Sequence, residues 1–297
     1  MSPEAFRKYL AFERQYSGHT VKAYLRDLRS FESYCKEQHG DTSINTLPYS
    51  VIRSWIITCL EDGCSNRTIN RKIASLKSYY RFLMRKGYIE SNPLAGHRPL
   101  KMDRKVEVPF SQEEMRELLS AWSTEDSDFE TLRDRLIVEL LYTTGMRRAE
   151  LIGIELTDLD LESGTLRVTG KRNKERLIPL VREVTPHIKE YLRARQESFP
   201  DSDSPVLLLT GSGNKIYETL VYRIINGYFS KVSSKVKKSP HILRHTFATH
   251  LLNKGADLNS VKELLGHASL ASTQVYTHNS IAELKKVHAS AHPRSKK

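Results

Sequence analysis

The segment from His241 to Tyr276 reads HILRHTFATHLLNKGADLNSVKELLGHASLASTQVY, and it concentrates more phosphate-handling chemistry than any other part of this 297-residue chain. Arg244 can place two parallel hydrogen bonds on a phosphate, and His241 and His267 can donate or move protons near neutral pH. Tyr276 offers an oxygen nucleophile. These side chains are the ones that phosphoryl transfer without a metal would need.

Taken singly, these residues have ordinary structural roles, since a lone histidine or tyrosine more often belongs to the core or the surface. His241 and His245 also have the i, i+4 spacing of a helical metal pair. No glutamate lies between them, and Arg244 would bring a repelling charge beside the ion. The sequence therefore disfavours a metal site, and the combination of residue types points to catalysis.

Three sequence blocks together resemble the tyrosine recombinase (phage integrase) family, and most closely its Xer branch. The blocks are TGMRRAEL at 144–151, GKRNKER at 170–176, and the pattern H-x-L-R-H, L-L-G-H and a tyrosine nine residues after that histidine. The resemblance runs over essentially the whole chain. Arg172 stands where the Xer pattern usually has glycine, so the turn around it loses a residue that tolerates positive φ.

The resemblance implies how the chain would act on a phosphodiester, whose negative oxygens repel a nucleophile. Arg147 and Arg244 would each bind non-bridging oxygens and neutralise the charge that builds up in the transition state. His267 would donate a further hydrogen bond there. Glu150 would hold Arg147, and His245 would be a packed helix residue.

The resemblance also assigns the proton transfers. His241 would assist Tyr276 as a base, and Tyr276 would become esterified to the 3′ phosphate. Lys171 would protonate the departing 5′ oxygen, although Lys174 shares its turn. The tyrosyl ester preserves the bond energy, so no ATP, metal or other cofactor is expected. The expected catalytic residues are Arg147, Lys171, His241, Arg244, His267 and Tyr276.

The composition indicates a polyanionic partner. The chain has 47 Lys and Arg against 35 Asp and Glu, a formal charge of +12. Residues 1–100 hold 16 Lys and Arg against 9 Asp and Glu, which is +7 of that charge. The three cysteines, Cys35, Cys59 and Cys64, lack C-x-x-C spacing and predict neither a disulfide framework nor a zinc site.

The length and pattern predict two domains of a mainly α fold with a small antiparallel sheet. Residues 1–90 read as a four-helix unit, which the resemblance implies is a core-binding (SAM-like) DNA-binding domain. Residues 91–107 read as a basic linker that contains prolines. Residues 108–297 would form a mixed α/β catalytic domain, opened by a capping box at Ser111. By resemblance, its last helix and basic tail would dock on a neighbouring protomer.

The fourth helix of the first domain has an apolar stripe and a basic face. The stripe consists of Ile69, Ile73, Leu76, Tyr80 and Leu83. A basic helical face is most often simply solvated, but in a domain of charge +7 it is a candidate for contact with a DNA groove. The candidate DNA-binding residues are Arg67, Asn70, Arg71 and Lys77.

In the second domain, helices are expected at 131–144, 186–197, 219–232, 243–254 and 258–265. Two short strands are expected at 166–168 and 176–180, joined by a polar turn that places Lys171 at its tip. A further short amphipathic helix is expected after residue 281. Arg147 would lie at the start of a helix, where amide groups can help to bind an anion.

The leading hypothesis is a Xer-like recombinase that acts on a double-stranded DNA site as a homo- or heterotetramer, with a septal DNA translocase as a further possible partner. Its role would be chromosome dimer resolution at cell division, in the cytoplasm, since no membrane span or signal segment is visible. Alternatives are an integrase or invertase of a mobile element, a silent architectural DNA-binding protein and a relaxing topoisomerase. The short chain leaves no room for an arm-binding domain, which favours the Xer role.

Overall fold

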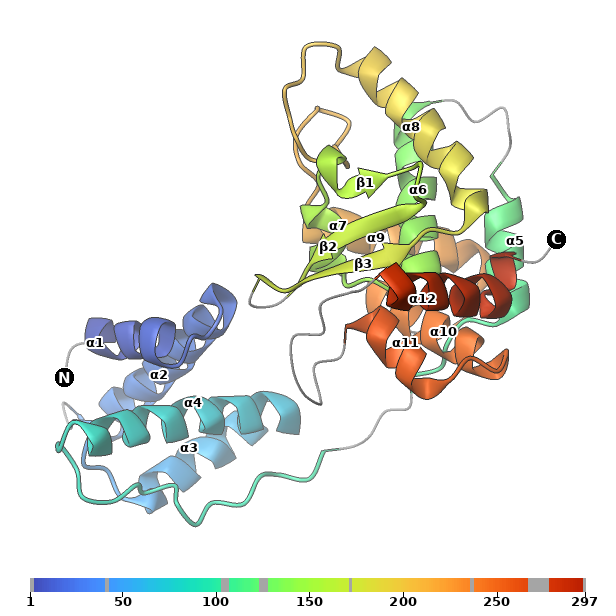
Figure 1. Cartoon of the computed structure of the whole chain (residues 1–297). Helices are drawn as coiled ribbons and strands as arrows, with labels where there is room; N and C mark the ends of the chain where they lie inside the picture. The colour runs from blue at the N-terminus through green and yellow to red at the C-terminus, as the bar shows by residue number, and fades with distance from the viewer. Residues whose placement is uncertain are drawn as a thin grey trace. The chain divides into compact units, whose positions relative to one another are not determined.

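The structure, a computed structural model, divides the chain into two units, Met1–Lys105 and Val106–Lys297 (Figure 1). It describes residues 3–40, 43–102, 107–122, 128–170, 173–235, 238–266 and 278–295. Within these residues the fold is mainly helical with one small antiparallel sheet, which confirms the predicted fold class.

The first unit is built from four α-helices. Ser17 and Ser65 cap the second and fourth of them, because each serine Oγ accepts from the amide three residues later, at 3.3 Å. A π-helical turn, Tyr9–Glu13, follows the first helix directly and was not expected from the sequence. The helices are α1 Pro3–Lys8, α2 Gly18–His39, α3 Tyr49–Glu61 and α4 Asn66–Arg85.

The apolar stripe of α4 forms the centre of this unit, as its spacing predicts. All five stripe residues are buried, and the Oη of Tyr80 donates to the carbonyl of Ile44 at 2.9 Å. Phe31 and Trp55 pack beside the stripe, with their ring centroids 4.9 Å apart. Cys35 and Cys59 are buried in the same core, and burial raises the pKa of Cys35 to about 11.

The first helix of the second unit begins at the predicted capping box. The amide of Glu114 donates to Ser111 Oγ at 3.0 Å, and the Ser111 amide donates to the Glu114 carboxylate at 2.6 Å. The unit's α-helices are α5 Gln112–Ser120, α6 Phe129–Thr144, α7 Arg148–Gly153, α8 Thr185–Ser198, α9 Glu218–Val232, α10 Pro240–Asn253, α11 Leu258–Leu265 and α12 His278–Ala291.

The sheet has three strands in the order β1 (Leu159–Asp160), β2 (Thr165–Thr169) and β3 (Glu175–Pro179). Both pairings are antiparallel, and Val168 lies opposite Arg176. The two longer strands match the prediction, whereas the two-residue β1 was too short to give a period-2 signal. Short 3₁₀ helices, Leu156–Asp158, Arg182–Val184 and Pro293–Ser295, complete the unit.

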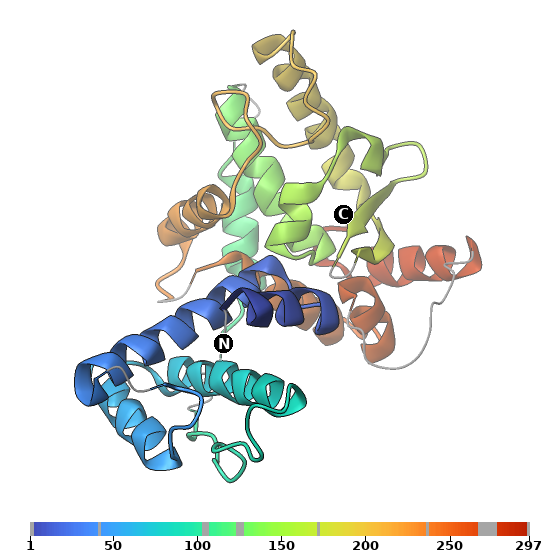
Figure 2. The same ribbon diagram turned by 90° about the vertical axis from the view of Figure 1, so that its left-hand side faces the viewer.

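The C-terminal segment packs on its own unit in this chain. α12 contacts β3, α10 and α11, and the ribbons of α11 and α12 lie side by side in Figures 1 and 2. His288, Ala291 and His292 are buried there. In this chain they lie against α6 and α10, because His288 and His292 approach the carbonyls of Thr143 and Tyr142 and pack near Phe247. Docking of the segment on a neighbouring protomer stays a prediction.

Candidate active site

The structure describes three of the six predicted catalytic residues: Arg147, His241 and Arg244. Lys171, His267 and Tyr276 lie outside the described residues, so their roles stay predictions.

Arg147 lies at a sharp junction between two helices. Gly145 ends α6 with φ +61°, and Arg147 is the residue immediately before α7. Glu150, in the first turn of α7, accepts from the Arg147 amide at 2.7 Å and from its Nη1 at 2.8 Å. The predicted hold of Glu150 on Arg147 is confirmed, and 42% of the arginine side chain stays exposed.

Arg244 approaches the same junction from α10, but it is buried. Its Nη1 donates to the carbonyl of Gly145 at 2.6 Å, and its Nη2 donates to the carbonyl of Leu265 at 2.7 Å. Burial lowers the pKa of Arg244 to about 10, and the nearby positive charge of Arg147 acts in the same direction. The guanidinium is still charged at neutral pH.

A third arginine, Arg176 on β3, completes the cluster and was not among the predicted site residues. Its Nη1 and Nη2 donate to the two carboxylate oxygens of Glu150 at 3.0 and 2.9 Å. Its Nε donates to the carbonyl of Leu264 at 3.1 Å. The available signal was its place in the strand: Arg176 has the same parity as the buried Ile178, and a buried arginine needs a partner.

Glu150 is the carboxylate around which the cluster is built, and its side chain is only 3% exposed. Burial by itself would raise the pKa of Glu150, but hydrogen bonds from Arg176 and from the Arg147 amide, the positive charge of Arg176 and the hydrogen bond from the Arg147 side chain lower it to about 2. One negative charge therefore lies among three guanidiniums. The surplus of positive charge suits an anion, and Arg147 is the most exposed of the three.

The same three arginines bind the end of α11. The last carbonyls of a helix lack partners within it and carry partial negative charge. Here Leu264, Leu265 and Gly266 each accept from one arginine: Arg176, Arg244 and Arg147 in turn, the last at 3.3 Å. Gly266 leaves the helix with φ +64°, and the next residue of the sequence is the predicted site residue His267.

His241 lies in the first turn of α10 and is 75% exposed, with its Nε2 3.7 Å from a carboxylate oxygen of Glu107. His245 is also exposed, so the expectation that it is packed is wrong. The buried histidine of this helix is His250, whose Nδ1 is bonded to the Oη of Tyr142 at 3.0 Å. Over the described ranges, no group of three His, Cys, Asp or Glu residues could hold a metal ion.

Two of the four predicted DNA-binding residues of α4 bind the segment that follows the helix. The side-chain amide of Asn70 donates to the carbonyl of Leu100 and accepts from its amide, both at 2.8 Å. Lys77 Nζ donates to the carbonyl of His97 at 3.1 Å. The expected linker is thus fixed to α4 as far as residue 101, where Asn66 binds the carbonyl at 2.8 Å.

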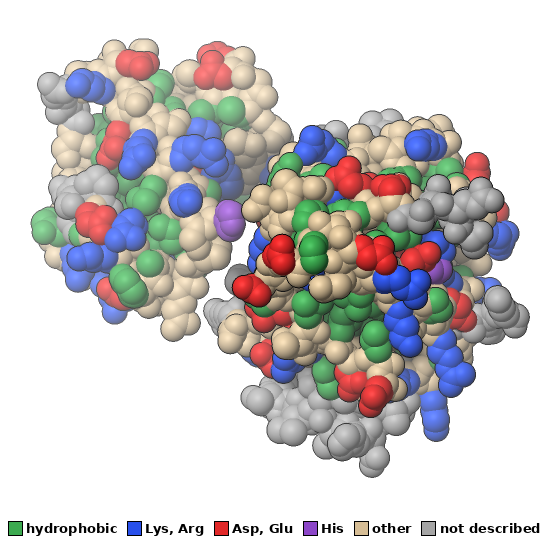
Figure 3. All heavy atoms as spheres, turned by 90° about the horizontal axis from the view of Figure 1, so that it is seen from above, with side chains coloured by type: hydrophobic (Ala, Val, Ile, Leu, Met, Phe, Trp, Pro, Cys, Tyr) green, Lys and Arg blue, Asp and Glu red, His purple; other side chains and the backbone are tan. Residues whose placement is uncertain are grey.

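The other two residues differ in exposure. Arg71 forms an ion pair with the buried Asp27, which also accepts from Ser75 at 2.7 Å. Arg67 is exposed. Figure 3 shows further Lys and Arg side chains spread over the first unit between apolar ones. DNA contact by this face stays a prediction, and Arg67 is the member most open to it.

The described part of the chain contains no helix that is both long and apolar enough to span a membrane.

Two family profiles match the chain. The one described as Phage integrase family covers residues 109–283, and the one described as Phage integrase, N-terminal SAM-like domain covers residues 4–87. The first of these ranges contains the whole arginine cluster.

Curated relatives match nearly the full length. The tyrosine recombinase XerC of Chlorobaculum parvum is 39% identical over 98% of this chain and 94% of its own. The tyrosine recombinase XerC of Bacillus subtilis is 38% identical over 98% and 95%. Among solved structures, the Tn1549 transposon integrase in complex with circular intermediate DNA is 24% identical, with a TM-score of 0.69 over 95% of this chain and 98% of that one. At this identity the structural likeness is one of fold.

Proposed function

Because this chain belongs to the phage integrase family, we propose that it is a site-specific DNA recombinase that breaks and rejoins strands through a 3′-phosphotyrosyl intermediate. The single observation that carries the proposal is the cluster of three guanidiniums around one buried carboxylate. Such a site binds a phosphodiester more strongly as negative charge accumulates on its oxygens.

In the proposed reaction the oxygen of Tyr276 attacks phosphorus, and its proton passes to His241. A bond from the tyrosine oxygen to phosphorus forms, the bond from phosphorus to the 5′ oxygen breaks, and Lys171 gives that oxygen a proton. His267 joins the arginines at the non-bridging oxygens. A 5′ hydroxyl from a second strand then attacks the tyrosyl ester, which rejoins the backbone and frees the tyrosine.

The three arginines differ in exposure, and the role proposed for each follows from that difference. Arg147, with 42% of its side chain exposed, is suited to direct contact with the phosphate. The buried Arg176 holds the surrounding backbone and Glu150. Arg244, which is also buried here and binds the Gly145 carbonyl, joins Arg147 at the phosphate in the proposed reaction. This arrangement supports the proposal that the electrostatic potential of the site is positive before DNA binds.

The biological setting is proposed from the relatives, which are curated as XerC recombinases. We place the protein in the cytoplasm, on a two-armed DNA site, in a homo- or heterotetramer of recombinases. Resolution of chromosome dimers at cell division, with a septal DNA translocase as partner, is the role we propose for it.

The experiment that tests this function looks for the covalent adduct. Duplexes selected from a randomised pool by binding to the wild type are nicked near their centre, so that the cleaved end diffuses away and the adduct accumulates. We expect a band of protein joined to DNA on a denaturing gel for wild type and none for Tyr276→Phe. If wild type binds these duplexes but forms no adduct on any, the chain is a DNA-binding architectural protein and the recombinase proposal fails.

A second substrate tests the general acid. Replacing the bridging 5′ oxygen at the cleavage position by sulfur gives a leaving group that needs no proton. We expect Lys171→Ala to be inactive on ordinary DNA and active on this substrate, with Lys174→Ala as the matched control. Rescue of Lys174→Ala instead would show that the other lysine of the turn is the acid.

A further inference from the structure

The C-terminal end of α6 has two backbone carbonyls that the helix cannot satisfy. If the helix continued, the carbonyls of Tyr142 and Thr143 would accept from the amides of Met146 and Arg147. Those amides are engaged elsewhere, with Thr144 Oγ1 at 3.2 Å and with the Glu150 carboxylate at 2.7 Å. The turn that delivers Arg147 thus leaves these two buried carbonyls in need of other donors.

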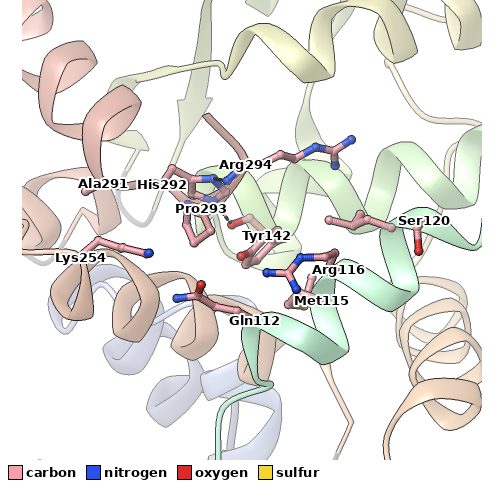
Figure 4. A pocket seen from close by; sticks show the side chains of 11 residues that line it. Gln112, Met115, Arg116, Ser120, Tyr142, Lys254, Ala291, His292, Pro293 and Arg294 are labelled. Atoms are coloured by element: carbon pink, nitrogen blue, oxygen red, sulfur yellow. Dashed lines mark hydrogen bonds between the residues drawn. The ribbon is translucent and has the colours of Figure 1, made fainter. Parts of the chain in front are cut away.

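Two histidines of the C-terminal segment supply those donors. His288 Nε2 lies 2.6 Å from the carbonyl of Thr143, and His292 Nε2 lies 3.3 Å from the carbonyl of Tyr142. A carbonyl can only accept, so each imidazole donates. Both rings are buried, and Figure 4 shows His292 beside Tyr142, with both residues lining the same pocket. The four-residue spacing of the two histidines matches two successive carbonyls of one helix end.

The bonded carbonyls lie next to the catalytic turn. Thr143 is two residues before Gly145, whose carbonyl accepts from Arg244, and four residues before Arg147. One short stretch of chain is therefore bound on one side by the arginine cluster and on the other by the C-terminal segment. A shift of the α6 end would move the Gly145 carbonyl and the Arg147 backbone together.

We infer that His288 and His292 are positioning residues for the proposed cleavage reaction. Their imidazoles cap α6 and hold the turn from Gly145 to Arg147 where the guanidiniums can converge on a phosphate. Loss of these two hydrogen bonds then slows cleavage, because the turn is no longer held at both carbonyls. The inference rests on the proposed function.

A separate anchor of the same segment provides a control. Arg294 Nη2 donates to Glu139 at 2.7 Å, and Glu139 also accepts from His187 Nδ1 at 2.8 Å. Glu139 lies one helical turn before Thr143, away from the catalytic turn. Arg294→Gln therefore loosens the segment without removing either cap, whereas His288→Phe keeps the ring and removes the donor. His288→Gln restores a donor at a position close to that of Nε2.

The test is single-turnover adduct formation on the nicked duplexes at saturating DNA, with the dissociation constant for DNA and the melting temperature measured for each variant. We expect His288→Phe to cleave at least about tenfold more slowly than wild type, equivalent to about 1.4 kcal/mol in the barrier. Its affinity for DNA should stay within about twofold of wild type. His288→Gln should recover most of the rate, and Arg294→Gln should stay close to wild type.

Three outcomes would overturn the inference: a wild-type rate in folded His288→Phe, a rate in His288→Gln as low as in His288→Phe, or an equal loss in Arg294→Gln. If His288→Phe does not fold, the pair His292→Phe and His292→Gln gives the same comparison at the longer bond. Cleavage by the wild type distinguishes failure of the proposed function from failure of the inference about the two histidines. Its absence refutes the proposed function, whereas its presence with unaffected variants refutes only the role of the caps.

Discussion

Replacing Glu150 by glutamine should remove the one negative charge at the centre of the arginine cluster while preserving shape. The Glu150 carboxylate accepts four hydrogen bonds, two from Arg147 and two from Arg176. Its pKa is about 2 against an ordinary 4.5. At 1.36 kcal/mol per pKa unit, the charged carboxylate contributes about 3 kcal/mol to the folded state. Glu150→Gln should lower the free energy of unfolding of the second unit by about that amount at pH 7.

The same argument predicts a pH dependence with a definite sign. Because the folded-state pKa of Glu150 is lowered, its contribution is fully present above pH 4.5 and is lost as the pH falls towards 2. The difference between wild type and Glu150→Gln should therefore be constant from pH 7 to pH 5 and shrink below that.

The chain offers a clean probe for the measurement. It has two tryptophans, Trp55 in the first unit and Trp122 in the second. In a Trp55→Phe background, urea unfolding followed by fluorescence reports on the second unit alone. Glu218→Gln is the matched control, because Glu218 binds Arg148 at 2.5 Å but is 53% exposed, and an exposed pair contributes under about 1 kcal/mol. Equal losses in the two variants, or a Glu150→Gln difference that persists unchanged to pH 3, would refute the reasoning.

Three further predictions concern the same unit. Gly145→Ala should lower the free energy of unfolding by more than about 2 kcal/mol, because the added Cβ would lie 2.3 Å from a ring carbon of Phe247 at φ +61°; an unchanged melting temperature would contradict this. Arg176→Lys should slow adduct formation at least about tenfold with DNA affinity retained, since an ammonium cannot bind both Glu150 oxygens; a wild-type rate would show that the fork is dispensable. Burial lowers the pKa of His288 to about 4, so docking of its segment is favoured above pH 6.5 and weakens as the pH falls from 6.5 to 4. Proteolysis of the C-terminal segment should speed up over that interval in wild type and not in the His288→Gln, His292→Gln double variant.

Local patterns in the sequence predict much of this fold correctly. The capping box at Ser111 and the apolar stripe of α4 depend on neighbours within one or two helical turns, and both are present. Arg147 and Arg244 could be selected because they stand in recognisable motifs. The two-residue β1 and the π-helical turn escaped prediction, since neither is long enough to show a period.

Tertiary partners were beyond the reach of the sequence. Arg176 bonds a carboxylate 26 residues away, and no local pattern indicates which acid a buried strand arginine will meet. The sequence predicts that the polar face of α4 is exposed to solvent or DNA. In the structure, Asn70 and Lys77 on that face bind the irregular segment after the helix. An irregular segment has no periodicity, so its packing on that face leaves no trace in the pattern. The cis docking of α12 depends on the same kind of distant contact.

The arginine cluster also bears on when, during folding, a newly made chain can assemble its active site. Its hydrogen bonds join Arg244 to Gly145, 99 residues apart, and Arg147 to Gly266, 119 residues apart. Contacts this distant in sequence form late in folding, because long loops must close before they are made. Contacts within the first unit close shorter loops, such as the 48 residues between Asp27 and Ser75. The first unit can therefore fold before the arginine cluster is assembled, and strand breakage requires the long-range contacts of the second unit.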